Sequence, residues 1–303
     1  MNATPVSRPC PLCGDAEAAD YLLKGGLRLV RCRQCGMVYA SPVPEEFVSG
    51  TYYDRLGADY YLSPAKLESD FADVRFEREL RLFRAHCARG AVLDVGCSTG
   101  AFLYQLNQRF PSSYDLVGAD ASGPALDYAA ARGVRVIRGA FPVVDFAGEI
   151  FDAVTFWAVL EHLNDPRAFL DKAWSVLKPQ GLCFALVPNL QSLAARLLGG
   201  RYRYFYPQHL NYFTRKTLLR LVEARFTVVA STCTHFNPVV VWQDWRGRGK
   251  DVSEQARAQL LKRTTAYKQN TWLGPVKALY RFVETALSRL SLADNLVVVL
   301  RKK

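Results

Sequence analysis

Short apolar segments alternate with helical segments between residues 91 and 187, and this alternation restricts the fold more than any other feature. Five predicted strands lie at 91–95, 115–120, 134–137, 151–157 and 181–187, and predicted helices lie at 103–110, 124–132 and 166–177. Apolar strands that are separated by helices are typical of a parallel sheet with both faces covered. The sequence therefore predicts an α/β fold with a layered sheet.

A glycine-rich segment, Asp94-Val-Gly-Cys-Ser-Thr-Gly100, joins the first predicted strand to the next helix. Gly96 permits a sharp turn, and Gly100 lets a ligand approach the backbone closely. Open α/β sheets bind ligands beyond the carboxyl ends of their strands, where this loop lies. Such a loop suits several nucleotide ligands, so by itself it does not decide between them.

Two carboxylates narrow the choice of ligand. Asp120 ends the second predicted strand, about twenty residues beyond the loop, where a carboxylate can accept hydrogen bonds from a ribose diol. Asp94 precedes the first glycine of the loop, and an acid is unfavourable beside a pyrophosphate. An acid does suit the ammonium group of a methionine moiety. The pair therefore favours S-adenosylmethionine over a dinucleotide.

Segments 92–103, 117–126, 151–166 and 177–182 together resemble the class I S-adenosylmethionine-dependent methyltransferases. The resemblance covers residues 88–236. It implies a Rossmann-like, seven-stranded sheet with helices on both faces and an antiparallel last strand, with 226–233 and 296–300 as the two further strands. It also implies that Asp94, Gly96 and Gly100 line the methionine end of S-adenosylmethionine and that Asp120 holds its ribose. We expect Cys97, Ala121 and Trp157 at the same site, with Phe141 packing on adenine.

Two tight cysteine pairs lie near the start of the chain, Cys10-Pro-Leu-Cys13 and Cys32-Arg-Gln-Cys35. A glycine follows each pair, permits a tight turn and leaves its N–H available to point at sulfur. Four thiolates in this spacing, with a predicted hairpin between them, indicate a structural zinc ribbon without an open coordination position. Two disulfides or a redox pair are the alternatives.

Two histidines are the candidate catalytic groups. His162 follows the fourth strand, and His209 lies in the aromatic segment 204–214. Either could be the general base of an SN2 methyl transfer, and either could instead be structural. The surroundings of His209 resemble those in zinc-containing sugar C-methyltransferases, where a matching histidine acts near the acceptor carbon. This chain departs from that group in its Gln208 and in its shorter length.

The chain divides into four predicted parts: a zinc ribbon at 1–42, a linker with tyrosines and a leading helix at 43–90, the methyltransferase core at 91–238, and a helical insertion with the final strand at 239–303. The leading helix is expected from residue 67 to Gly90. In the insertion, a polar helix is expected at 253–270 and an amphipathic one from 274. The apolar face of the second helix could pack on its own domain, on a second copy of the chain in a homodimer, or peripherally on a membrane.

The leading functional prediction is a methyltransferase that acts on a small molecule, namely a sugar, a lipid or a secondary metabolite. The net charge of +11 keeps an RNA methyltransferase open, although the end of the fourth strand lacks the Asn/Asp-Pro-Pro-aromatic motif of base-amine enzymes. A non-catalytic binding protein on the same scaffold is the third alternative. No apolar run long enough to span a membrane and no apolar signal core are present, so we expect a cytoplasmic protein.

Overall fold

The structure is a computed structural model that describes residues 5–247, 256, 258–260, 262–263, 265 and 274–303. Its centre is a seven-stranded sheet in the order β12-β13-β10-β9-β6-β7-β8. Strand β13 runs antiparallel to both β10 and β12, and the pairs among β6 to β10 are parallel. The predicted α/β sheet with one antiparallel strand is therefore confirmed. Its strands are β6 (Gly90–Val95), β7 (Tyr114–Asp120), β8 (Arg135–Arg138), β9 (Phe151–Trp157), β10 (Leu177–Pro188), β12 (Phe226–Thr234) and β13 (Asn295–Lys302).

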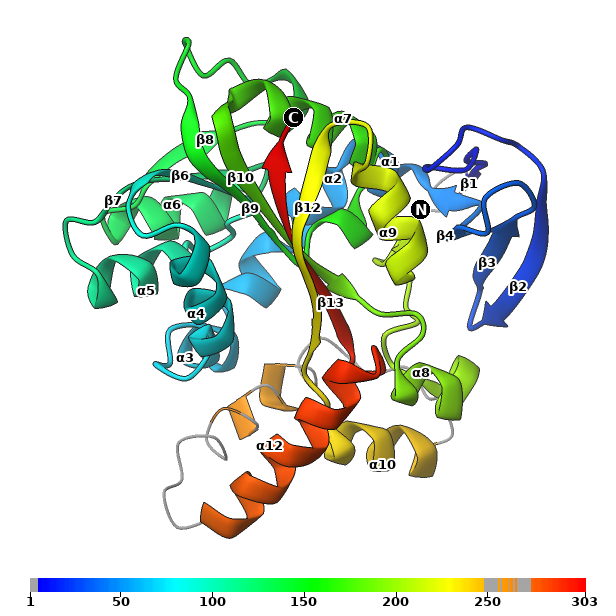
Figure 1. Cartoon of the computed structure of the whole chain (residues 1–303). Helices are drawn as coiled ribbons and strands as arrows, with labels where there is room; N and C mark the ends of the chain where they lie inside the picture. Colours follow the sequence, from blue (N-terminus) through cyan, green and yellow to red (C-terminus); the bar gives the residue numbers. More distant parts are fainter. Residues whose placement is uncertain (1–4, 248–255, 257, 261, 264, 266–273) are drawn as a thin grey trace.

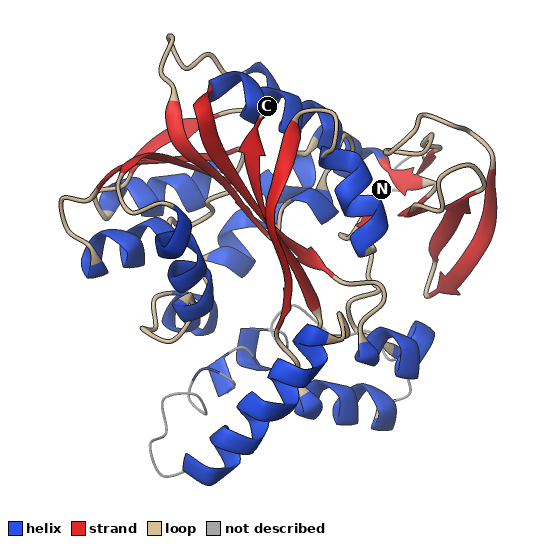
Figure 2. Cartoon of the chain, in the orientation of Figure 1, coloured by secondary structure: helices blue, strands red, loops and turns tan. Residues whose placement is uncertain are grey.

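Helices cover both faces of this sheet (Figures 1 and 2). Because side chains alternate along a strand, neighbouring residues of β10 enter different cores. Phe184 packs in the cluster that contains Phe102 of α5, whereas Cys183 packs in the cluster that contains Leu218 of α9. The helices around the sheet are α4 (Glu77–His86), α5 (Ala101–Arg109), α6 (Gly123–Ala131), α7 (Pro166–Val176) and α9 (Arg215–Val222).

A second, four-stranded sheet contains the predicted hairpin and has the order β11-β4-β3-β2. Gly25 and Gly26 form the turn of the hairpin with φ values of 50° and 83°, which glycine adopts readily. Three strands come from the cysteine-bearing segment, and the fourth lies after β10 in the chain. The strands are β2 (Ala18–Lys24), β3 (Leu27–Cys32), β4 (Val38–Ala40) and β11 (Asn211–Tyr212), and the short pair β1 (Pro5–Val6) and β5 (Val43–Pro44) lies beside them in sequence.

The segment between the two sheets differs from the single leading helix that the sequence predicted. Helix α3 (Pro64–Asp70) ends before α4 begins, and Gln105 of α5 bonds to the backbone at this break. Its Nε2 donates to the carbonyl oxygens of Asp70 and Ala72, at 3.1 and 2.8 Å. Before α3, this segment contains α1 (Glu45–Ser49), α2 (Thr51–Leu56) and the π-helical η1 (Gly57–Tyr61).

The tail contributes α10 (Pro238–Arg246) and α12 (Gly274–Arg289), whereas the predicted helix at 253–270 falls largely outside the described residues. The predicted apolar face of α12 is divided between core and surface. Leu287 is 8% exposed, but Leu290 is 67% exposed and the neighbouring Phe282 is 73% exposed. The remaining short helices are α8 (Leu193–Leu198) and the 3₁₀ turns η2 (Phe141–Val143), η3 (Leu160–His162) and η4 (Gly199–Arg201). Among the described residues, no helix has the length and apolar character needed to cross a bilayer.

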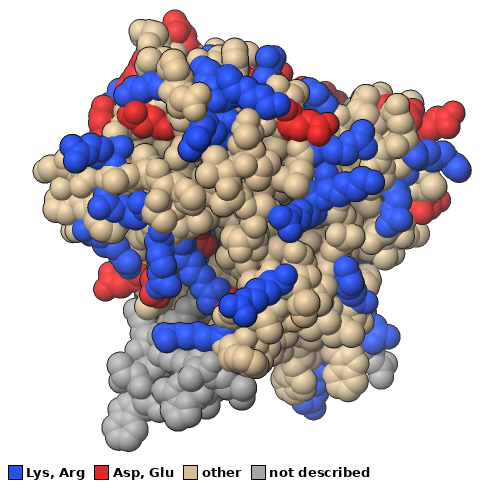
Figure 3. All heavy atoms as spheres, viewed as in Figure 1, with Lys and Arg blue, Asp and Glu red and all other residues tan. Residues whose placement is uncertain are grey.

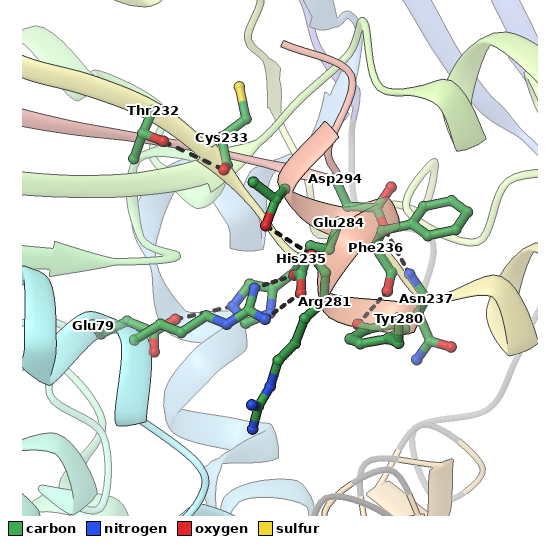
Figure 4. A network of polar contacts seen from close by, with 12 residues as sticks. Glu79, Thr232, Cys233, His235, Phe236, Asn237, Tyr280, Arg281, Glu284 and Asp294 are labelled. Atoms are coloured by element: carbon green, nitrogen blue, oxygen red, sulfur yellow. Dashed lines mark hydrogen bonds and ion pairs between the residues drawn. The ribbon is translucent and has the colours of Figure 1, made fainter. Parts of the chain in front are cut away.

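Polar contacts fasten α12 to the core where β12 ends (Figure 4). The guanidinium of Arg78 on α4 bonds to both carboxylate oxygens of Glu284, which is 3% exposed. Nearby, His235 Nε2 lies 3.1 Å from Glu79 Oε1. Burial works to raise the pKa of Glu79, but the bond from His235 and its charge outweigh burial and lower the pKa to about 2. The buried carboxylate of Glu284 therefore ties α12 to α4, and that of Glu79 ties the end of β12 to α4.

Replacing Arg78 with Met should cost more stability than replacing Glu284 with Gln. The first change leaves a buried carboxylate unpaired, at about 2–4 kcal/mol, whereas the second leaves a partly exposed guanidinium that water can solvate, at about 1 kcal/mol. Urea unfolding measures both. Arg81→Met, which breaks an exposed pair with Glu77, is the control and should change stability by about 0.5 kcal/mol or less. Equal losses for the first two variants would contradict this account.

Candidate active site

The glycine loop after β6 is shaped by its contact with Val159, the residue directly before η3. Gly96 has φ +71°, and a Cβ there would lie 2.6 Å from Cγ2 of Val159. Gly100 has φ +72°, and a Cβ there would lie 3.0 Å from the Cβ of Ala129 on α6. Both positions combine a left-handed backbone with a close neighbour, so glycine is required at each. The loop therefore lies directly against the segment that leads to His162.

Asp120 joins two loops at the carboxyl edge of the sheet. Its Oδ2 accepts a hydrogen bond from the Ser98 N–H at 2.8 Å, and its Oδ1 accepts one from the Ser122 N–H at 2.9 Å. The carboxylate thus fixes the glycine loop relative to the turn after β7. This is the edge at which a ribose would lie if the loop held a nucleoside.

Asp94 lies beneath the same loop and is 3% exposed. Thr155 Oγ1 donates a hydrogen bond to its Oδ1 at 2.6 Å. Burial raises the pKa of Asp94 to about 7, although the bond from Thr155 opposes the shift, and the charge of Asp120 adds to it. A buried carboxylate in this state is stabilised by any cation that binds beside it.

Three other residues predicted at the cofactor site take different positions. The Cys97 sulfur packs on β7, since a Cβ on Gly118 would lie 2.6 Å from it. Ala121 is exposed just beyond Asp120. The Trp157 ring lies 5.1 Å from that of Phe102, and its indole Nε1 is buried without a hydrogen-bond partner among the described residues. Any contact of Cys97 with a ligand would therefore come from its backbone.

The Phe141 ring lies inside the core and is 3% exposed. Its neighbours are the rings of Phe146, Phe156 and Phe169, at centroid distances of 5.9, 6.1 and 5.7 Å. This packing leaves the ring without an open face, so we do not include Phe141 in the proposed adenine contact.

The structure brings the two candidate histidines together. Their ring centroids lie 4.8 Å apart in an edge-on arrangement, although 47 positions separate them in the chain. The Nδ1 of His162 lies 2.9 Å from the carbonyl oxygen of Gln208, and the Nδ1 of His209 lies 3.1 Å from that of Tyr204. A carbonyl oxygen only accepts, so Nδ1 carries the proton in each ring and Nε2 carries the lone pair. Burial lowers the pKa of His162 to about 4, which keeps that ring neutral.

Glu161 is a site residue that the sequence prediction omitted. It is 1% exposed, and its Oε2 has no hydrogen-bond partner within the described part of the chain. Burial raises the pKa of this carboxyl to about 8. One oxygen of Glu161 and one nitrogen from each histidine lie within 4.8 Å of one another. Its position directly before His162 was the signal that could have identified it.

Two tyrosines from the segment before α3 interact with groups of the candidate site. The Tyr53 hydroxyl is 3.0 Å from Nδ1 of His162. Burial raises the pKa of both Tyr53 and Tyr61, and the negative charge of Asp120 adds to both shifts. The charge of Tyr206, beside His209, also raises the pKa of Tyr61. The tyrosines therefore link the glycine-loop edge to the histidine pair.

The segment that carries Glu161 and His162 is held by β11. The Asn211 amide donates to the carbonyl oxygens of Leu160 and Leu163 at 2.9 and 2.7 Å. The Leu210 N–H donates to the carbonyl oxygen of Glu161 at 2.7 Å. Because β11 pairs with β4, the four-stranded sheet sets the position of the segment that carries Glu161 and His162.

The four predicted metal ligands form one cluster. The sulfurs of Cys10 and Cys35 are 3.4 Å apart, those of Cys13 and Cys32 are 3.5 Å apart, and all four lie within 4.8 Å of one another. Ligands about 2.3 Å from a tetrahedral zinc lie about 3.8 Å apart, so the arrangement fits that ion. The expected role of the glycines was partly wrong. Their N–H groups donate to the carbonyl oxygens of Cys10 and Cys32 rather than point at sulfur.

Comparison with known proteins agrees with this geometry. A family described as a methyltransferase domain matches residues 71–230, more than half of the chain. The chain belongs to the class I S-adenosylmethionine-dependent methyltransferases. The crystal structure of a SAM-dependent methyltransferase from Thermotoga maritima has a TM-score of 0.54 and 17% identity, and the match covers 84% of this chain and 99% of that one. At that identity, the likeness shows the fold alone.

Two curated relatives of this methyltransferase differ in the atom they methylate. A ubiquinone biosynthesis O-methyltransferase from a Chelativorans strain is 34% identical over 37% of this chain and 46% of its own length. A ubiquinone/menaquinone biosynthesis C-methyltransferase from Desulfotalea psychrophila is 24% identical over 73% of this chain and 92% of its own. The chain thus spans about half the length of the first relative.

Replacing Gly96 with Ala should destabilise the methyltransferase more than replacing Gly133 with Ala. Both glycines have positive φ, but a Cβ on Gly133 meets nothing within 4 Å. We expect a loss of about 1 kcal/mol for Gly133→Ala from backbone strain alone. The added contact with Val159 should bring Gly96→Ala to about 2–4 kcal/mol. Thermal or urea unfolding compares them, and equal losses would show that the loop does not press on η3.

Proposed function

We propose that this protein transfers the methyl group of S-adenosylmethionine to a small molecule, such as a sugar, a lipid or a secondary metabolite. Asp94, Gly96 and Gly100 hold the methionine end of the donor, and Asp120 holds its ribose. His162 and His209 lie at the acceptor. The position of Asp120, bonded to the loops after β6 and β7, carries this proposal.

The charges at the loop support a cationic donor. The donor carries an ammonium group and a sulfonium, and Asp94 is a buried carboxylate that such charges stabilise. Asp120 offers acceptors to a ribose diol at the neighbouring strand end. A dinucleotide would instead place its pyrophosphate beside Asp94, where an anion is unfavourable.

The reaction requires orientation and the removal of one proton. The acceptor atom attacks the methyl carbon in line with the carbon–sulfur bond, whose electron pair returns to sulfur and leaves S-adenosylhomocysteine. The acceptor's proton departs toward the histidine pair, where a neutral imidazole is available as the base. The hydroxyl of Tyr53 lies beside this pair, 3.0 Å from Nδ1 of His162.

A small-molecule acceptor is preferred to RNA. On the face shown in Figure 3, Lys and Arg side chains are scattered among acidic and uncharged residues and do not gather in one stripe. Nucleic-acid binding typically uses a continuous basic footprint. The net charge of +11 is compatible with this dispersed pattern.

Methyl-labelled S-adenosylmethionine tests the proposal. We expect label to enter a sugar, lipid or other small-molecule fraction of a cell extract and to stay out of RNA. Asp120→Asn should reduce the transfer about tenfold or more, because a charged acceptor is lost from the ribose site. Asp127→Asn removes an exposed carboxylate of α6 and should leave transfer unchanged.

Binding of S-adenosylhomocysteine is measured beside transfer, by thermal shift and calorimetry. Wild-type protein and Asp127→Asn should bind it, and Asp120→Asn should bind it more weakly. Label found only in RNA would refute the choice of acceptor. A protein that neither binds S-adenosylhomocysteine nor transfers label would be a binding protein on this scaffold.

We further propose that Cys10, Cys13, Cys32 and Cys35 hold a structural zinc ion. The spacing of the four sulfurs supports this assignment, as does the buried guanidinium of Arg8 nearby. Burial lowers the pKa of Arg8 to about 10, and the charge of Cys10 opposes that shift. A tetrathiolate zinc centre is anionic and would stabilise this guanidinium further.

Cys13→Ser should remove one zinc equivalent from each chain relative to the wild type, as measured by elemental analysis. The variant should also unfold at lower temperature, because structural zinc contributes to the folding free energy. Cys233→Ala changes a cysteine outside the cluster and should keep the full zinc content. Unchanged zinc content in Cys13→Ser would exclude this site.

A further inference from the structure

Glu161, His162 and His209 form a second group of metal-ligand type, separate from the four cysteines. One carboxylate oxygen and two imidazole nitrogens lie within 4.8 Å of one another. Glu161 and His162 are consecutive in η3, and His209 precedes β11. Two histidines and one carboxylate are a donor set that binds divalent metal ions and leaves other coordination positions open.

The orientation of both imidazoles suits metal binding. Each Nδ1 lies at hydrogen-bond distance from a backbone carbonyl oxygen, of Gln208 for His162 and of Tyr204 for His209. This contact fixes the tautomer and makes Nε2 the basic nitrogen. Metal-binding histidines typically bond in this way through their second nitrogen, which orients the ring. The carbonyls of one segment, 204–208, thus orient both rings.

Glu161 supplies an independent observation, because its buried carboxylate lacks a counter-charge. It is 1% exposed, and Oε2 has no hydrogen-bond partner among the described residues. Among those residues, Lys and Arg make ion pairs with other acids but not with Glu161. Burying an unpaired carboxylate is costly, and a bound cation removes that cost.

The spacing of the donor atoms fits an ion after a small adjustment. Donor atoms about 2.1 Å from one ion lie about 3.0–3.6 Å apart, somewhat closer than the upper limit of 4.8 Å found here. Rotation of the Glu161 carboxylate can close this gap, since its Oε2 has no bond to break. The two rings are already in contact, with centroids 4.8 Å apart.

The cluster lies beside the proposed donor site. Val159, two residues before Glu161, contacts the glycine loop at Gly96. Tyr53 contacts His162, and the charges of Glu161 and Asp120 both raise the pKa of Tyr53. An atom bound at the histidines is therefore near the edge where the donor's methyl group is expected.

We propose that Glu161, His162 and His209 bind a divalent metal ion that holds an oxygen of the methyl acceptor. Imidazole and carboxylate donors suit Mn²⁺, Fe²⁺, Co²⁺ or Zn²⁺. The bound hydroxyl loses its proton to solvent, the resulting oxyanion attacks the donor's methyl carbon, and S-adenosylhomocysteine leaves. The acceptor is then an oxygen nucleophile or a carbon activated by a neighbouring enolate oxygen. The role of the ion rests on the proposed methyl transfer, but its binding does not.

Titration with Mn²⁺, followed by electron paramagnetic resonance, tests ion binding without any acceptor. The protein is first brought to one zinc per chain, so that the cysteine cluster is filled. Mn²⁺ is the weakest competitor of the first-row divalent ions and does not displace that zinc. We expect one Mn²⁺ per wild-type chain, with pulsed-resonance couplings from two histidine nitrogens.

Glu161→Gln should weaken Mn²⁺ binding by more than about tenfold, and His209→Gln should remove one nitrogen coupling. His86→Gln changes an exposed histidine and Glu149→Gln a partly exposed acid, and both should bind like the wild type. Binding of S-adenosylhomocysteine reports whether each variant is folded. Since the wild-type spectrum alone identifies the nitrogen ligands, the test does not depend on any variant folding.

Mn²⁺ that does not bind, or that binds without nitrogen couplings, would overturn the metal site and leave the histidine pair as the base. S-adenosylhomocysteine binding would remain in that case, which separates this failure from failure of the methyltransferase proposal. Bound Mn²⁺ with two nitrogen couplings, lost in the Glu161 and His209 variants, would establish the site.

Discussion

The pairing of β11 with β4 is the constraint on which the candidate site depends. This pairing places Leu210 and Asn211 against η3, and their three hydrogen bonds fix the backbone on both sides of His162. Arg8 reinforces the junction, because its guanidinium donates to the carbonyl oxygens of Leu210 and Asn164 and to Asn211 Oδ1. The cysteine-bearing segment therefore supports the candidate active site, because its strands β2, β3 and β4 form one sheet with β11.

The junction is polar although it is buried. Arg8 is 7% exposed and Asn211 is 2% exposed, and both side chains donate to carbonyl oxygens of loops. A backbone carbonyl in a loop has no ladder partner, so a side-chain donor must supply one. A long side chain with several N–H groups can donate to several such carbonyl oxygens at once. Irregular segments can therefore be buried beside the site.

The seven-stranded sheet could be predicted from the sequence because the patterns that indicate its strands are local. Apolar strand segments and glycine turns are readable within short windows, and the motif order supplied the topology. The helix break at residues 71–76 was missed, because the backbone there bonds to Gln105, about thirty residues away on α5, and no local pattern reveals this contact. Phe141 was expected beside adenine, but a phenylalanine near a strand end can turn inward, and here three core rings surround it.

The histidines were predicted one at a time, and their contact was not, because it depends on β11 joining the small sheet. A two-residue strand in an aromatic segment leaves no periodic pattern to read. Glu161 was passed over for a related reason. Its significance is that it is buried without a partner, which becomes visible only when its neighbours are known.

The two buried carboxylates of the site, Asp94 and Glu161, differ in the partner that each one needs. Burial raises the pKa of Asp94 and of Glu161 above the ordinary carboxyl range, to about 7 and about 8. Asp94 has a hydrogen bond from Thr155, whereas Oε2 of Glu161 has none among the described residues. The ammonium group of the donor suffices beside Asp94, whose carboxylate is partly satisfied. The other carboxylate needs a proton or a stronger cation. The two imidazoles beside it favour a metal ion, because the Nε2 lone pair of each ring can bind the same ion.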